Sequence, residues 1–247
     1  MTFGDNMTEL IGNKYMLNDI TLYDSVDQIV AHMMAEHLAE KISYSDEGTD
    51  RSYWHLCTPG AFDKELIVVA VLGYPERVGV WSYTLLHQSR VDASSMEPYF
   101  RAFNHHQWCV VAINPNMPVP DSEGEAFVYQ LEKVLSTIGP EQRIGLIGFS
   151  MGGRILVEFL EQRPELINRV MGLALIDPTL PNRLRVNRIR SLLDHNTLLI
   201  ASEGDVMSPG KIASVLLDIP AVTFSGIHGE MPNKALNEVI DFYAERI

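Results

Sequence analysis

The segment from Arg143 to Ile155 reads R-I-G-L-I-G-F-S-M-G-G-R-I, and it decides the fold. Its first five residues, ending at Ile147, have the apolar character of a buried strand. The motif Gly148-Phe149-Ser150-Met151-Gly152 follows at once, and an apolar stripe of helical period begins at Ile155. A Gly-x-Ser-x-Gly motif between a strand and a helix holds its serine on a sharp turn, where the glycines avoid side-chain clashes. The segment therefore predicts that Ser150 is a nucleophile.

Short apolar runs alternate with helical patterns on both sides of this segment. The expected strands are Leu66 to Leu72, Trp108 to Ile113, Arg143 to Ile147, Val170 to Ile176, Thr197 to Ala201 and Ala221 to Phe224. Helical periodicity is found at Phe127 to Ile138, Ile155 to Leu160 and Leu236 to Tyr243. Strands that alternate with helices of this length are joined by right-handed crossovers. The predicted fold class is therefore α/β, with a mostly parallel central sheet and helices on both faces.

The N-terminal part fits this alternation less well. No long linker or repeat divides the chain, so residues 1–247 are expected to form a single domain with residues 1–48 as an N-terminal helical extension. Within the extension, an amphipathic helix is expected to open near Asp24 or Ser25 and to run to Glu40. Lys41 to Ser45 and Ser52 to Thr58 are expected as antiparallel edge strands. No role is assigned to the extension.

Composition excludes several classes of function. The net charge of -13 repels a phosphate backbone and argues against nucleic acid as a partner. The longest apolar run, Leu66 to Leu72, is far shorter than the roughly 20 residues of a membrane-spanning helix. No signal peptide is visible, and the two cysteines, Cys57 and Cys109, cannot build a disulfide framework, so a cytoplasmic location is expected. No metal-binding motif occurs, and His105 and His106 are adjacent and point apart.

Two later positions complete a recognisable pattern. Asp205 follows the strand that ends at Ala201, and His228 follows the last strand, just before the closing helix. With the serine motif, this order resembles the α/β-hydrolase superfamily from about Leu66 to the C-terminus. The resemblance implies a triad of Ser150 as nucleophile, His228 as general base and Asp205 as the carboxylate that orients the histidine.

A second carboxylate competes for the acid role. Asp177 also lies at a strand end, where some family members place the acid, but Asp177-Pro178 is typical of a turn or helix N-cap. Asp205 is therefore preferred.

The same resemblance implies an oxyanion hole. One N–H comes from the residue after the nucleophile, here Met151, and the second from the loop after the first long strand. The family usually shows His-Gly there, and this chain has Leu72-Gly73 followed by Tyr74 and Pro75. Proline has no N–H, so Tyr74 is expected to be the second donor.

These residues predict a serine hydrolase that cleaves an ester, thioester or related acyl bond through an acyl-Ser150 intermediate, without a cofactor. Two alternatives stay open. One is a non-catalytic binding protein of the same fold. The other is a nucleotide-binding loop at Gly148 to Gly153, although Arg154 replaces the usual lysine and Ile155 has no hydroxyl for a metal ion.

The segment between Asp177 and the strand at Thr197 bears on the substrate. It spans only about twenty residues, so a minimal lid is expected. It also holds four arginines in an acidic chain, at Arg183, Arg185, Arg188 and Arg190. Such a patch would attract an anionic acyl substrate. The favoured interpretation is instead that these arginines flank the apolar stripe of a helix from Val186 to Leu193, with their charged groups in water.

Overall fold

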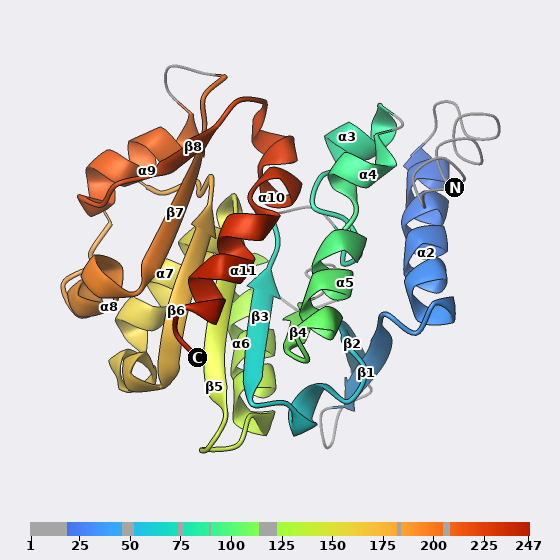
Figure 1. Ribbon diagram of the computed structural model, residues 1–247, viewed down its shortest axis with the longest axis horizontal. Helices are drawn as coiled ribbons and strands as arrows, with labels where there is room; N and C mark the ends of the chain where they lie inside the picture. The colour runs from blue at the N-terminus through green and yellow to red at the C-terminus, as the bar shows by residue number, and fades with distance from the viewer. Residues whose placement is uncertain are drawn as a thin grey trace.

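A computed structural model describes residues 19–45, 52–73, 77–88, 90–113, 123–181, 184–204 and 208–247 (Figure 1). The strands are β1 (Glu40–Ser45), β2 (Ser52–Cys57), β3 (Leu66–Val71), β4 (Cys109–Ala112), β5 (Arg143–Phe149), β6 (Val170–Ile176), β7 (Thr197–Ser202) and β8 (Val222–Phe224). The α-helices are α2 (Asp19–Ala35), α3 (Tyr83–His87), α4 (Val91–Ser94), α5 (Glu97–His105), α6 (Glu123–Thr137), α7 (Met151–Gln162), α8 (Arg190–His195), α9 (Pro209–Leu217), α10 (Met231–Lys234) and α11 (Leu236–Ala244). Three short 3₁₀ turns are η1 (Ala61–Asp63), η2 (Pro164–Arg169) and η3 (His228–Glu230).

The strands form one eight-stranded sheet in the order β1-β2-β4-β3-β5-β6-β7-β8. β1 pairs with β2, and β2 with β4, in antiparallel fashion, whereas every pair from β4 to β8 is parallel. The six strands expected in the core are all present, as are the two antiparallel edge strands. The predicted α/β class with a mostly parallel sheet is confirmed.

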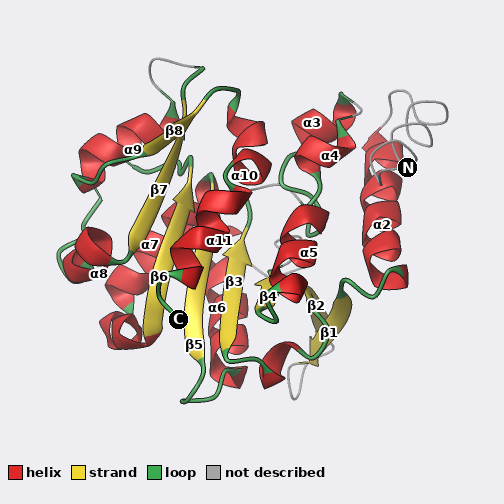
Figure 2. Ribbon diagram, viewed as in Figure 1, coloured by secondary structure: helices red, strands yellow, loops and turns green. Residues whose placement is uncertain are grey.

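Side chains of alternate strand residues enter two separate cores. In β3, Val68 packs on the face covered by α2, α5 and α11, while Val69 packs on the face covered by α6 and α7. Figure 2 shows helices on both sides of the sheet. Because both faces are covered, β3 and β4 are apolar at every position, which is why they appear as continuous apolar runs in the sequence.

The N-terminal helix departs from its expected bounds. It starts before Asp24 and ends at Ala35 instead of Glu40. His37 adopts a left-handed φ of 54°, and Leu38 N–H donates to the carbonyl of Met33, a pattern that closes a helix end. Val26, Ile29 and Met33 are buried in the core, and β1 joins the sheet, so this described part of the N-terminal extension packs against the sheet.

The segment between β6 and β7 also differs from expectation. The described residues there contain one short helix, α8, which begins at Arg190 and not near Val186. Arg188 N–H donates to the side chain of Glu161 at 3.0 Å instead of to a helical carbonyl. Arg190 donates to the carbonyls of Leu217 and Asp218 at the end of α9 and so ties the two helices together.

Candidate active site

Ser150 is the only residue between the end of β5 and the start of α7. Its backbone has φ 54° and ψ −120°, a conformation that non-glycine residues rarely adopt. Its N–H donates to the carbonyl of Ile176 at 3.1 Å, and its own carbonyl accepts from Gly153 at 3.2 Å and Thr179 at 3.0 Å. These bonds hold the strained turn, and strain of this kind is typical of functional sites.

The two motif glycines allow this turn to pack tightly. A Cβ at Gly148 would lie 2.5 Å from the Cα of Gly153, and a Cβ at Gly152 would lie 2.1 Å from the carbonyl oxygen of Val71. The start of α7 therefore rests directly on the end of β3. One residue between strand and helix does not make a loop that could wrap a phosphate, so the nucleotide-binding alternative is wrong.

Asp177 follows the last residue of β6, the strand beside β5, and is fully buried. Its Oδ1 accepts from Gly210 N–H at 2.6 Å and from Ser202 N–H at 3.4 Å, and its Oδ2 accepts from Ser202 Oγ at 3.2 Å. These donors compensate the cost of burying a carboxylate. Like Ser150, Asp177 has a positive φ, of 43°.

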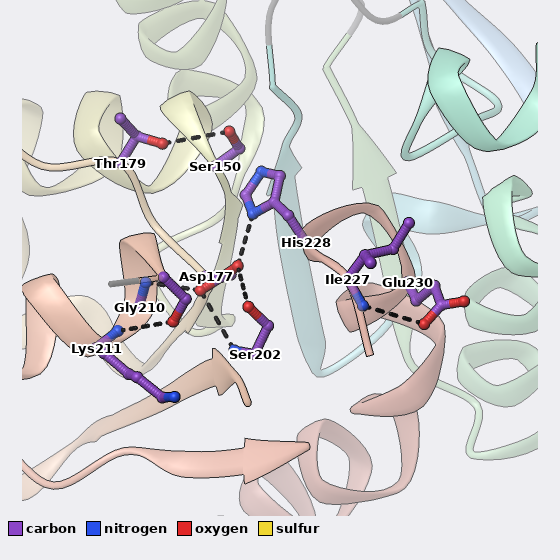
Figure 3. A network of polar contacts seen from close by, with 10 residues as sticks. Ser150, Asp177, Thr179, Ser202, Gly210, Lys211, Ile227, His228 and Glu230 are labelled. Atoms are coloured by element: carbon purple, nitrogen blue, oxygen red, sulfur yellow. Dashed lines mark hydrogen bonds and ion pairs between the residues drawn. The ribbon is translucent and has the colours of Figure 1, made fainter. Parts of the chain in front are cut away.

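His228 lies after β8, and its Nδ1 is 2.7 Å from Oδ2 of Asp177. Its ring stacks on Phe149, with centroids 4.8 Å apart and an angle of 26° between the planes. Figure 3 shows the ring between Asp177 and Ser150, with its second nitrogen on the side of Ser150. The Ser150 Oγ is 3.5 Å from Oγ1 of Thr179.

The acid preferred from the sequence is not the one that the described structure places at the histidine. The contact with His228 Nδ1 is made by Asp177, the alternative. Asp205 lies outside the described residues. The order of strands in the sheet explains the outcome, because β6 is the immediate neighbour of β5 and its carboxyl end therefore lies next to Ser150. Sequence alone offered one signal, the position of Asp177 directly after a buried strand.

Of the two expected oxyanion donors, Met151 lies within the described residues. Met151 is the first residue of α7, so its N–H has no acceptor within the helix and lies at the positive end of the helix dipole. Tyr74 lies outside the described residues.

The described part of the chain holds no group of three or more histidine, cysteine or acidic side chains that could bind a metal ion. Cys57 and Cys109 are free and buried, and burial raises the pKa of both thiols, that of Cys109 to about 12. None of the described helices is both long and apolar enough to span a membrane.

Comparison with known proteins gives a family model and several similar structures. The model of the alpha/beta hydrolase fold matches residues 93–201. The predicted CIB-like hydrolase of Thermoplasma acidophilum is 16% identical, with a TM-score of 0.54 over 84% of this chain and 98% of that one. The thioesterase domain from the curacin biosynthetic pathway is 12% identical, with a TM-score of 0.58 over 84% and 99%. A thermostable carboxylesterase cloned from a metagenomic library is 14% identical, with a TM-score of 0.52 over 92% and 98%. No curated protein matches the chain in sequence.

The eight-stranded sheet between two helical layers defines an α/β protein whose candidate site lies at the carboxyl ends of β5 and β6. The sheet topology, the family model and the similar structures together show that this protein has the α/β-hydrolase fold. The resemblance drawn from the sequence is confirmed.

Proposed function

We propose that the protein is a serine hydrolase that cleaves an ester, thioester or related acyl bond through an acyl-Ser150 intermediate. The observation that carries this proposal is the 2.7 Å contact between Asp177 and His228, beside a serine with a strained, left-handed backbone. A buried carboxylate that orients a histidine next to a serine is the arrangement that activates a hydroxyl nucleophile. The acid role passes from Asp205 to Asp177.

Each residue then has a defined part in the reaction. His228 takes the Oγ proton as Ser150 attacks the acyl carbon, and it gives that proton to the departing alcohol or thiol. Water then attacks the acyl-enzyme, His228 again moves the proton, and the acid product leaves with Ser150 restored. Asp177 accepts the Nδ1–H bond, which sets the tautomer and stabilises the imidazolium. The N–H of Met151 stabilises the oxyanion of the tetrahedral intermediates, with Tyr74 as the second proposed donor.

An anionic substrate remains part of the proposal in a narrower form. The Arg190 side chain donates hydrogen bonds to carbonyls at the end of α9, so it is not part of the proposed attraction. Among the described arginines of the segment, Arg185 and Arg188 keep exposed side chains, and they precede α8 instead of flanking its apolar stripe. These two positive charges are proposed to attract a substrate that carries a phosphate or free carboxylate.

A labelling and turnover experiment tests the function. A fluorophosphonate probe should label the wild-type protein and leave Ser150→Ala unlabelled. On a panel of acyl esters and thioesters with neutral and anionic leaving groups, Ser150→Ala should lose at least roughly 10³-fold in kcat while its circular dichroism is unchanged. Wild-type turnover in Ser150→Ala would overturn the mechanism. A wild-type protein that neither labels nor turns over any substrate would instead favour the non-catalytic binding protein.

A further inference from the structure

The turn that carries His228 is only partly buried. It runs from Ser225, after β8, to Glu230, and Ile227 beside the histidine is 50% exposed. Gly226 within it has φ 136°, a conformation that favours glycine. Because the histidine must meet Asp177 and Ser150 with good geometry, other contacts have to hold this turn in place.

The carboxylate of Glu230 makes those contacts. Its Oε2 accepts a hydrogen bond of 3.2 Å from the N–H of Ile227, which is the residue that precedes the histidine (Figure 3). The same oxygen is 2.9 Å from Nζ of Lys234, and Oε1 forms an ion pair with Arg90. Lys234 also donates to the carbonyl of Ser225, at the start of the turn.

Glu230 is also held in its charged state. Its side chain is 11% exposed. The hydrogen bond from Lys234, followed by that from Arg90, lowers the pKa of its carboxyl to about 2. A charged carboxylate accepts stronger hydrogen bonds than a neutral one, so the contact with Ile227 persists at neutral pH.

Arg90 links this turn to a distant part of the chain. It lies between α3 and α4, in the segment that follows β3, and 140 positions separate it from Glu230. Nearby, Nδ2 of Asn233 donates to the carbonyls of Asp92 at 2.8 Å and Ser95 at 2.9 Å. The turn is therefore tied to the start of α4 by an ion pair, and α10, which follows the turn, is tied to the same helix by two hydrogen bonds.

Gly226 leaves the space that the ion pair occupies. A Cβ there would lie 2.3 Å from Oε2 of Glu230 and 2.3 Å from Nζ of Lys234. A side chain at this position would displace the Glu230 carboxylate, the Lys234 ammonium or both. The ion pair of Glu230 with Lys234 therefore depends on the absence of a side chain at Gly226.

We propose that Glu230 is a positioning residue that holds the turn of His228 through Ile227, Arg90 and Lys234. This inference rests on the proposed function, in which His228 is the general base. Glu230 itself bonds to the backbone beside the histidine and acts through it. Loss of the carboxylate should let the ring drift from Asp177, and small displacements of a catalytic group cost roughly 10²-fold in rate.

The test compares Glu230→Gln with Glu97→Gln. Glu97 is a matched control, because it is also a buried glutamate with an ion pair to an arginine four residues on, and it lies on α5. Two readouts apply. One is kcat and KM on the best substrate, and the other is the downfield proton resonance of the His228 Nδ1–H bonded to Asp177, followed by NMR.

Glu230→Gln should lower kcat by roughly 10- to 100-fold with little change in KM, and should broaden or abolish the downfield resonance. Arg90→Gln and Gly226→Ala should do the same in part, which keeps the test open if Glu230→Gln does not fold. Glu97→Gln should retain both signals. A resonance and a kcat in Glu230→Gln that match those of Glu97→Gln would overturn the inference. If the wild type has no activity, the proposed function fails, while the resonance still decides whether Glu230 positions the ring.

Discussion

Backbone conformation separates the candidate site from the rest of the described residues. Five non-glycine residues there have a positive φ. His37, Gln107 and Asp218 lie just after helices, where a left-handed residue commonly ends the helix. Ser150 and Asp177 instead follow strands that are neighbours in the sheet. Neither residue closes the end of a helix, and the strain at two adjacent strand ends marks the place where the two side chains are presented together.

At the residue scale, we predict the effect of Asp177→Asn. Asparagine has the same shape and tolerates a left-handed backbone, so the fold should persist. It should favour the wrong histidine tautomer and lower kcat by roughly 10³- to 10⁴-fold. Steady-state kinetics provide the measurement.

Asp218→Asn is the control, because Asp218 has a φ of 53° but lies exposed at the end of α9. It should leave kcat unchanged. If Asp177→Asn keeps its activity and Asp205→Asn loses it, the acid role returns to Asp205.

The elements meet most closely where α7 begins. This helix has to start immediately after Ser150 to offer the Met151 N–H, and it can do so only because the backbone at Gly152 touches the end of β3. The contact is between backbones, with Val71 and Leu72 contributing carbonyl oxygens, so no side-chain rotation can relieve an added methyl group. The distance between this helix and the sheet is thus set by glycine.

At the element scale, we predict the effect of Gly152→Ala. A Cβ that would lie 2.1 Å from the carbonyl oxygen of Val71 must push α7 away from β3. The free energy of unfolding should fall by at least about 2 kcal/mol, and turnover should fall as well because Ser150 moves with the helix. Urea denaturation followed by circular dichroism measures the first effect.

Gly139→Ala serves as the comparison. Its nearest contact would be 3.4 Å away, with the side chain of Gln142, which can move. Equal stability losses in the two variants would contradict the account given for Gly152.

At the scale of the whole molecule, burial of a titratable group on the antiparallel side of the sheet couples stability to pH. His55 lies in β2, is fully buried and contacts the ring of Tyr44. Burial lowers the pKa of His55 to about 4, whereas an unfolded histidine titrates near 6.5. Between these values the unfolded chain binds a proton that the folded protein excludes. The contribution of the neutral histidine to the free energy of unfolding is therefore present above pH 6.5 and is lost progressively as the pH falls toward 4.

We predict that the wild type loses up to about 3 kcal/mol of stability from this group between pH 6.5 and pH 4. His55→Gln should be less stable at neutral pH but should show a shallower loss over the same interval. Urea midpoints at half-unit pH steps measure the slope. His195→Gln, at an exposed position, should keep the wild-type slope. A wild-type slope in His55→Gln would disprove the coupling.

Local patterns in the sequence were enough to determine the fold class and to predict part of the candidate site. Strands that are buried on both faces of the sheet appear in the sequence as apolar runs. The glycines around Ser150 indicate a tight turn, because that turn forms within a few residues. His228 could be found because it follows the last strand. Only the tertiary structure decided which carboxylate meets it. Asp177 does so because β6, and not β7, lies beside β5, and strand order is set by packing between segments far apart in the chain. The same holds for Glu230, whose partner Arg90 lies 140 positions away, since no local pattern encodes a contact across that separation.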